Sequence, residues 1–126
     1  MTSAKRRKTD FDLVRALREF QGVTAVSLPA GQVVAYRGHY APGVYLLVQG
    51  TLELLMETNG GEPATRVLDA RDGAVAVPDP ERFHEPLPWT VSVKKPSRLL
   101  FVPRSILFHD DDVRRILESA ALSRSI

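Results

Sequence analysis

The stretch from Leu28 to Leu54 limits the fold more than any other part of the sequence. Gly31 and Gly38 mark turns within it, and residues that favour strands fill the runs beside these turns. An isolated glycine, Gly50, then interrupts the strand-forming pattern, which indicates a bend or bulge where a side chain would not fit. The strand-forming runs are Gln32–Tyr36, Val44–Gln49 and Thr51–Thr58. This pattern predicts a chain that winds through short strands around a barrel.

The same glycines form part of a longer motif. Glycines at two fixed positions precede a tyrosine–leucine strand that ends in a further glycine, and the residues of this motif are Gly31, Gly38, Ala41, Tyr45, Leu47 and Gly50. With them, and with Thr90–Arg104, the chain resembles the cyclic nucleotide-binding domain family. The resemblance implies a mainly β fold, a jelly-roll β-barrel (double-stranded β-helix) with a short N-terminal helix and a C-terminal helix. Because one fold can carry many functions, the function has to be argued from the site.

Length and composition fit one ordinary globular domain. The chain has 126 residues, of which 44% are hydrophobic and 25% charged, so it can bury a modest core without covalent cross-links. It has no cysteine, which excludes disulfides, thiol catalysis and cysteine-bound metals and favours a reducing cytoplasm. No apolar run is long enough for a bilayer, and no secretory signal is visible at the N-terminus. We therefore expect a cytoplasmic protein that does not interact with a membrane.

The basic residues are unevenly distributed. Four of the 17 lie in the run Lys5–Lys8, and the remaining 13 face 15 acidic residues, so the rest of the chain is mildly acidic. Such a run can contact nucleic acid or an anionic surface, but a solvated terminal tail is the simpler interpretation. We expect residues 1–9 to be a disordered basic tail and residues 10–126 to form the single domain.

Two helices are expected, one at each end of the domain. Apolar residues at helical spacing predict a helix over Phe11–Phe20 that covers one end of the barrel. The second is the final element, expected from near Ser105 to about Ser123, in which Asp110–Asp112 place negative charge where a helix N-terminus favours it. Its apolar face consists of Val113, Ile116, Leu117 and Ala120. This face can form a homodimer, as in the family, or fold back onto the barrel. The residues beyond Pro103 are too few for an added DNA-binding domain.

The least regular segment is Pro78–Trp89, in which four of twelve residues are proline. Proline lacks a backbone donor, so neither a helix nor a central strand is expected here, and a stiff surface loop is predicted. Turns at Asn59–Gly61 and Arg71–Gly73 precede this segment, leading to strands near Ala64–Leu68 and Ala74–Val77.

By resemblance, this segment corresponds to the family's phosphate-binding cassette, in which an arginine pairs with the phosphate and a Gly-Glu pair holds the ribose. In this sequence the arginine position falls on Leu87, the small residue after it on Trp89, and the Gly-Glu pair near Ala76-Val77. Each missing charge-assisted hydrogen bond would forfeit about 1.5–3 kcal/mol, so the usual binding of cAMP or cGMP is not expected. The candidate ligand-binding residues are Gly73, Ala74, Ala76, Glu81, Arg82, Phe83, Leu87, Trp89 and Thr90.

Two further interpretations of the barrel stay open. Trp89, Phe83 and Tyr40 can form the walls of an apolar ligand pocket, or they can fill the space that a nucleotide would occupy. A metal site is the other alternative, because Gly73–Pro78 with His84 is similar to the second motif of cupins, and His39 stands near their first. Two histidines make a sparse ligand set.

Catalysis finds no support in the sequence. The serines lack a nucleophile-elbow setting, and no glycine-rich loop with lysine suits a nucleoside triphosphate. We therefore expect a non-catalytic regulatory or sensor module that acts through another small ligand or through a protein partner. The sequence does not identify the ligand or a cofactor.

Overall fold

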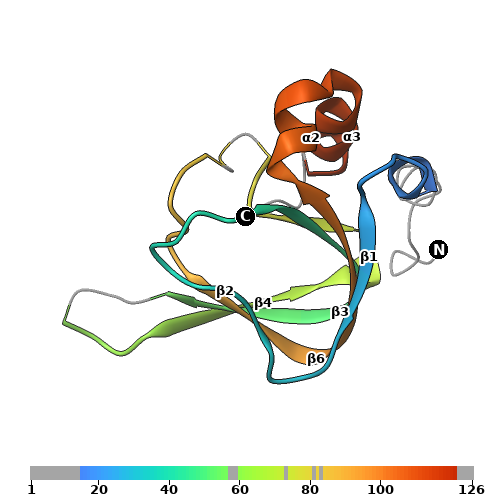
Figure 1. Ribbon diagram of the computed structural model, residues 1–126. Coiled ribbons are helices and arrows are strands. Elements are labelled where there is room, and N and C mark those ends of the chain that lie inside the picture. The colour runs from blue at the N-terminus through green and yellow to red at the C-terminus, as the bar shows by residue number, and fades with distance from the viewer. Residues whose placement is uncertain (1–14, 57–59, 73, 81, 83, 122–126) are drawn as a thin grey trace.

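The computed structural model describes residues 15–56, 60–72, 74–80, 82 and 84–121. Within these ranges the chain forms a six-stranded antiparallel sheet with short helices at both ends (Figure 1). The strands are β1 Thr24–Leu28, β2 Val33–Ala35, β3 Gly43–Met56, β4 Ala64–Asp69, β5 Val75–Val77 and β6 Thr90–Pro103. The helical elements are η1 Ala70–Asp72, α2 Arg104–His109 and α3 Asp111–Ala121. This architecture confirms the predicted mainly β jelly-roll fold.

The sheet is ordered β1-β6-β3-β4, with β2 also paired to β6 and β5 also paired to β3. In the described part of the chain it is open between β1 and β4 rather than closed into a complete barrel. The two long strands β3 and β6 form its centre, and the shorter strands add to their edges. Helices α2 and α3 lie together at one end of the sheet (top of Figure 1).

Gly50 bends β3 without ending it. The register between β3 and β6 shifts on both sides of this position, and Gly50 has a φ of 108°. Ser97 on β6 completes the bulge: its Oγ accepts a hydrogen bond from the Thr51 N–H at 3.1 Å and donates one to the Lys95 carbonyl at 2.7 Å. The predicted bend at Gly50 is therefore confirmed, but Val44–Gln49 and Thr51–Met56 are halves of one strand.

The apolar side chains form two clusters, one on each face of the central strands. The first lies under the helices and contains Leu17, Val44, Leu46, Ala74, Ala76, Leu100, Val102, Leu107, Val113 and Leu117. The second fills the inside of the jelly roll with Ala41, Leu47, Leu52, Leu54, Leu68, Ala70, Val75, Val77, Leu87, Trp89, Val91, Val93 and Leu99. Strand β5 contributes alternate residues to the two clusters, because successive side chains of a strand point to opposite faces.

The C-terminal helix α3 begins where the acidic triplet predicts. The Asp110 carboxylate accepts hydrogen bonds from the backbone N–H groups of Asp112 and Val113, at 3.0 and 3.1 Å, and so caps the helix. Val113 and Leu117 are fully buried against the sheet, so the helix folds back onto the chain's own core. A dimer through α3 stays a prediction, and it would have to use side chains other than these two. The side chain of Ala120 lies outside the described residues.

The predictions for the N-terminal segment fall only partly within the described ranges. Residues 15–18 are helical, in agreement with the predicted helix over Phe11–Phe20, and Leu17 is fully buried in the cluster under the helices. The basic tail 1–9 lies outside the described residues. No helix in the described part of the chain is long and apolar enough to cross a membrane.

Candidate functional site

The residues at the cassette positions identified by resemblance are buried and apolar. Val77, Leu87 and Trp89 are 2%, 3% and 5% exposed, and all three belong to the cluster inside the jelly roll. Ala74 and Ala76, also candidates from the sequence, are buried in the other cluster, under the helices. The structure therefore brings Leu87 and Trp89 together with Val75 and Val77, but it separates them from Ala74 and Ala76.

The loop that precedes β6 is attached to the turn after β2. The N–H of Gly38 donates to the Leu87 carbonyl at 2.8 Å, and the N–H of Leu87 donates to the His39 carbonyl at 2.9 Å. The hydroxyl of Thr90 accepts a hydrogen bond from the Arg37 N–H at 3.1 Å. These contacts hold Leu87 and Trp89 over the interior of the jelly roll. In the described residues of this segment the predicted loop is confirmed, and it lies against the sheet.

The remaining candidates in this loop point to solvent or fall outside the described residues. Arg82 is exposed, and backbone hydrogen bonds place it in a turn with Asp79 and Glu85. Gly73, Glu81 and Phe83 lie outside the described residues. Tyr40, considered as a pocket wall, is 61% exposed and so lies on the outside of the molecule.

The two histidines of the metal hypothesis are both on the surface. His39 lies beside Tyr36, with ring centroids 5.9 Å apart, and the side chain of His84 is 59% exposed, with Nε2 3.9 Å from a carboxylate oxygen of Glu85. Within the described ranges no three histidine, cysteine, aspartate or glutamate residues gather into a group that could hold a metal ion.

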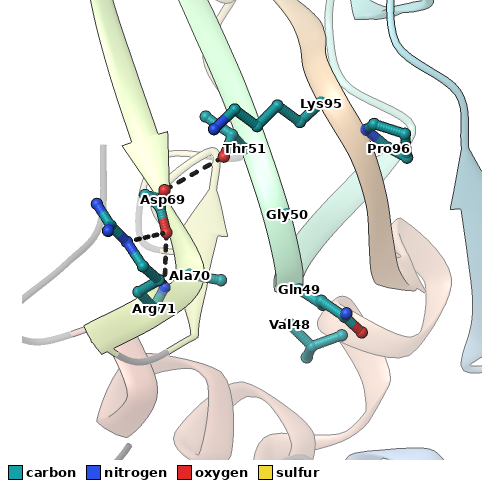
Figure 2. Close-up of a pocket in the computed structure, with 9 residues that line it drawn as sticks. All are labelled: Val48, Gln49, Gly50, Thr51, Asp69, Ala70, Arg71, Lys95 and Pro96. Atoms are coloured by element: carbon teal, nitrogen blue, oxygen red, sulfur yellow. Dashed lines mark hydrogen bonds and ion pairs between the residues drawn. The ribbon is translucent and has the colours of Figure 1, made fainter. Parts of the chain in front are cut away.

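A polar groove of about 610 Å³ opens on the outer surface beside the Gly50 bulge (Figure 2). We call it the Gly50 groove, and its lining residues are Val48, Gln49, Gly50, Thr51, Asp69, Ala70, Arg71, Lys95 and Pro96. Two smaller depressions of about 400 Å³ also lie on the surface. One is lined by Tyr36, Arg37, His39 and Thr90, and the other includes Gln49, Pro96 and Arg98.

Asp69 is the most strongly held side chain of the Gly50 groove. One carboxylate oxygen accepts from the Arg71 backbone N–H at 2.8 Å and lies 3.4 Å from Arg71 Nε, and the other accepts from the Thr51 hydroxyl at 3.2 Å. Partial burial raises the pKa of Asp69, but these hydrogen bonds and the charge of Arg71 outweigh it, so the pKa lies below its usual value. The ionised form is therefore favoured in the folded protein.

This pKa shift predicts how the stability of the chain depends on pH. Asp69 contributes stability above the pKa of an unfolded aspartate, 3.8, and loses it as the pH falls through the lower folded value. Asp69→Asn should lower the free energy of unfolding by about 1 kcal/mol at about pH 7, and the difference from the natural chain should shrink as the pH falls below 3.8 and through the lower folded pKa. Urea unfolding across this range measures both effects.

Glu85→Gln is the control for that experiment, because Glu85 is an exposed carboxylate elsewhere on the surface. It should follow the natural chain within about 0.5 kcal/mol at each pH. An Asp69→Asn difference that persists unchanged at the lowest pH would contradict the assignment.

Comparison with known proteins places these features in context. The sequence model of the cyclic nucleotide-binding domain matches residues 25–109. A comparison with curated protein sequences gave no match. Many solved structures are similar in fold, and they are similar at low sequence identity.

Three of these structures illustrate the degree of similarity to this chain. The N-terminal domain of a transcriptional regulator from Streptomyces coelicolor is 19% identical, with a TM-score of 0.62, and the match covers 98% of this chain and 87% of that one. The catabolite activator protein of Thermus thermophilus is 17% identical, with a TM-score of 0.64 and coverages of 93% and 54%. A candidate cAMP-binding regulatory protein from Silicibacter pomeroyi is 17% identical, with a TM-score of 0.61 and coverages of 87% and 51%. The chain therefore spans about half the length of the last two proteins.

Proposed function

This chain belongs to the cyclic nucleotide-binding domain family, and we propose that it is a non-catalytic regulatory module that does not bind cAMP or cGMP in the family's usual way. The observation that supports this proposal is the burial of Leu87 and Trp89 at the cassette positions where the family places an arginine and a small residue. A phosphate there would lose its charge-assisted partner. It would also have to displace apolar side chains that are packed in the core.

The proposed regulation uses the packing around β5. Val75 and Val77 contact the cluster inside the jelly roll, and Ala74 and Ala76 contact the cluster under α2 and α3. Because both clusters are closely packed, a movement of β5 on one side requires an adjustment on the other. In this proposal a ligand or a partner protein shifts β5 or the loop before β6, and the helices report the change.

Isothermal titration calorimetry with cAMP and cGMP tests the proposal. We expect no saturable heat up to about 1 mM nucleotide, because a site without its two charged contacts loses two or more decades of affinity. Saturable binding in the micromolar range would contradict the proposal.

An NMR titration of the same samples locates any binding that does occur. Chemical-shift changes at the amides of Leu87, Trp89 and Thr90 would indicate an unusual cassette site and would also contradict the proposal.

A thermal-shift series with divalent metals tests the cupin-like alternative. Stabilisation by a metal, lost in His39→Ala and in His84→Ala, would instead support the cupin-like alternative.

A further inference from the structure

Three groups of the Gly50 groove lie in one row across the sheet. In the strand register Thr51 on β3 is opposite Asp69 on β4 and also opposite Lys95 on β6. Residues that are directly opposite in antiparallel strands point to the same face. The register therefore places a carboxylate, a hydroxyl and an ammonium group side by side, and Figure 2 shows these three side chains on neighbouring strands.

The acceptors in this row are already used within the chain. Both oxygens of Asp69 accept hydrogen bonds, one from Thr51 and the other from Arg71. The Thr51 hydroxyl donates its proton to this carboxylate, and Thr51 is 4% exposed. The Asp69 carboxylate therefore has a structural role, because it holds the Arg71 side chain through Nε.

By contrast, the hydrogen-bond donors of the groove are only partly used by the described residues. Arg71 uses only its backbone N–H and Nε toward Asp69, and within the described ranges its two terminal nitrogens have no partner. The Lys95 ammonium group likewise has no partner among the described residues. Both side chains are exposed, and that of Arg71 is 83% exposed. Two cations against one carboxylate leave the lining with an excess of positive charge.

The groove has space for a small ligand. It lies over the Gly50 bulge, where β3 packs closely against Ser97 and Pro96 of β6. The volume of about 610 Å³ is in the range of small-molecule sites. Val48, Ala70 and Pro96 supply apolar surface beside the charged groups.

We propose that the Gly50 groove binds a small organic anion through a phosphoryl or carboxyl group held between Arg71 and Lys95. A guanidinium with two free nitrogens suits an oxyanion in bidentate geometry, and the lysine adds a second positive charge. Asp69 is a positioning residue, since it orients Arg71 and does not contact the ligand. This inference rests on the proposed function in one respect: the anion would be the ligand of the regulatory module. The binding of the anion to the groove does not depend on whether the cassette binds a nucleotide.

An NMR titration with pyrophosphate, citrate and sodium chloride as probes tests this proposal on the full chain. Pyrophosphate and citrate should shift the amides of Gly50, Arg71 and Lys95 in a saturable manner, whereas chloride at matched ionic strength should not. Preference for one of the two anions distinguishes a phosphoryl from a carboxyl ligand. Lys95→Gln should weaken the binding about threefold to tenfold, as expected for one partly exposed ion pair.

Lys94→Gln is the matched control, because Lys94 is the neighbouring exposed lysine of β6 and does not line the groove. It should leave the affinity unchanged. Equal losses in Lys94→Gln and Lys95→Gln, or shifts that rise linearly with all three salts, would overturn the proposal. Thermal unfolding of both variants establishes that they are folded. Chemical-shift changes at Gly50, Arg71 and Lys95 on adding the anions test this inference. Chemical-shift changes at Leu87–Thr90 on adding cyclic nucleotides test the proposed function, so either proposal can fail without the other.

Discussion

Gly50→Ala should be among the most destabilising single substitutions in this chain, lowering the free energy of unfolding by about 3–5 kcal/mol. Two costs add at this position. The φ of 108° is in the left-handed region, which a residue with a Cβ rarely adopts. An added Cβ would also lie 2.3 Å from Ser97 Oγ, 2.6 Å from Ser97 Cα and 2.7 Å from the Pro96 carbonyl oxygen. Two of these three atoms belong to the backbone, so the clash cannot be relieved by turning a side chain.

Substitutions at two other glycines allow the cost of the backbone conformation and the cost of the clash to be measured separately. Gly31 has a φ of 92° and open space around it, so Gly31→Ala should show the cost of the backbone conformation alone, about 1–2 kcal/mol. At Gly43 the φ is not in the left-handed region, but an added Cβ would lie 2.1 Å from the Val102 carbonyl oxygen. Gly43→Ala should therefore show the cost of a clash alone. Urea unfolding of the three variants measures the three costs, and a Gly50→Ala loss no larger than that of Gly31→Ala would contradict the role of the bulge.

The bend at Gly50 and the start of α3 could be predicted because each depends on local chemistry. A glycine within a strand pattern signals a bulge, and Asp110 caps the following residues through its own side chain. The continuity of β3 could not be predicted in the same way. A glycine that ends a strand and a glycine that bends one look alike in sequence, and Ser97, a residue 46 positions away from Thr51, decides between them.

Strand β1 was missed for a related reason. Thr24–Leu28 is a strand because it pairs along its whole length with β6. Such pairing between distant segments is not visible in a local pattern. The break between α2 and α3 at Asp110 was also not predicted, because the pattern after Ser105 indicates one continuous element.

The Gly50 groove could not be found from the sequence, because its residues come from three separate segments. Asp69, Thr51 and Lys95 are neighbours only through the register of β3 with its two partner strands. The cassette segment is the opposite case. The sequence showed that Leu87 stands in place of the arginine and Trp89 in place of the small residue, but whether these side chains line a pocket or fill the core depends on packing. In the structure both are buried in the cluster inside the jelly roll.

Trp89→Ala should lower the free energy of unfolding by about 3–5 kcal/mol, because a large side chain that is 5% exposed would leave a cavity in a packed cluster. Trp89→Phe keeps most of the apolar volume and should lose less. Tyr40→Ala is the surface control, since Tyr40 is 61% exposed and should lose about 0.5 kcal/mol or less. Urea unfolding of the three variants gives the comparison.

The cavity in Trp89→Ala also provides a direct test of whether Trp89 occupies a ligand-type space. An apolar cavity of this kind can bind a small apolar molecule, so indole at about 1 mM should raise the melting temperature of Trp89→Ala and leave that of the natural chain unchanged. A loss below about 1 kcal/mol in Trp89→Ala would mean that the side chain is not packed as a core residue. Because Leu87 and Val77 belong to the same cluster as Trp89, cAMP should not replace indole in this assay: its phosphate would lie among apolar side chains.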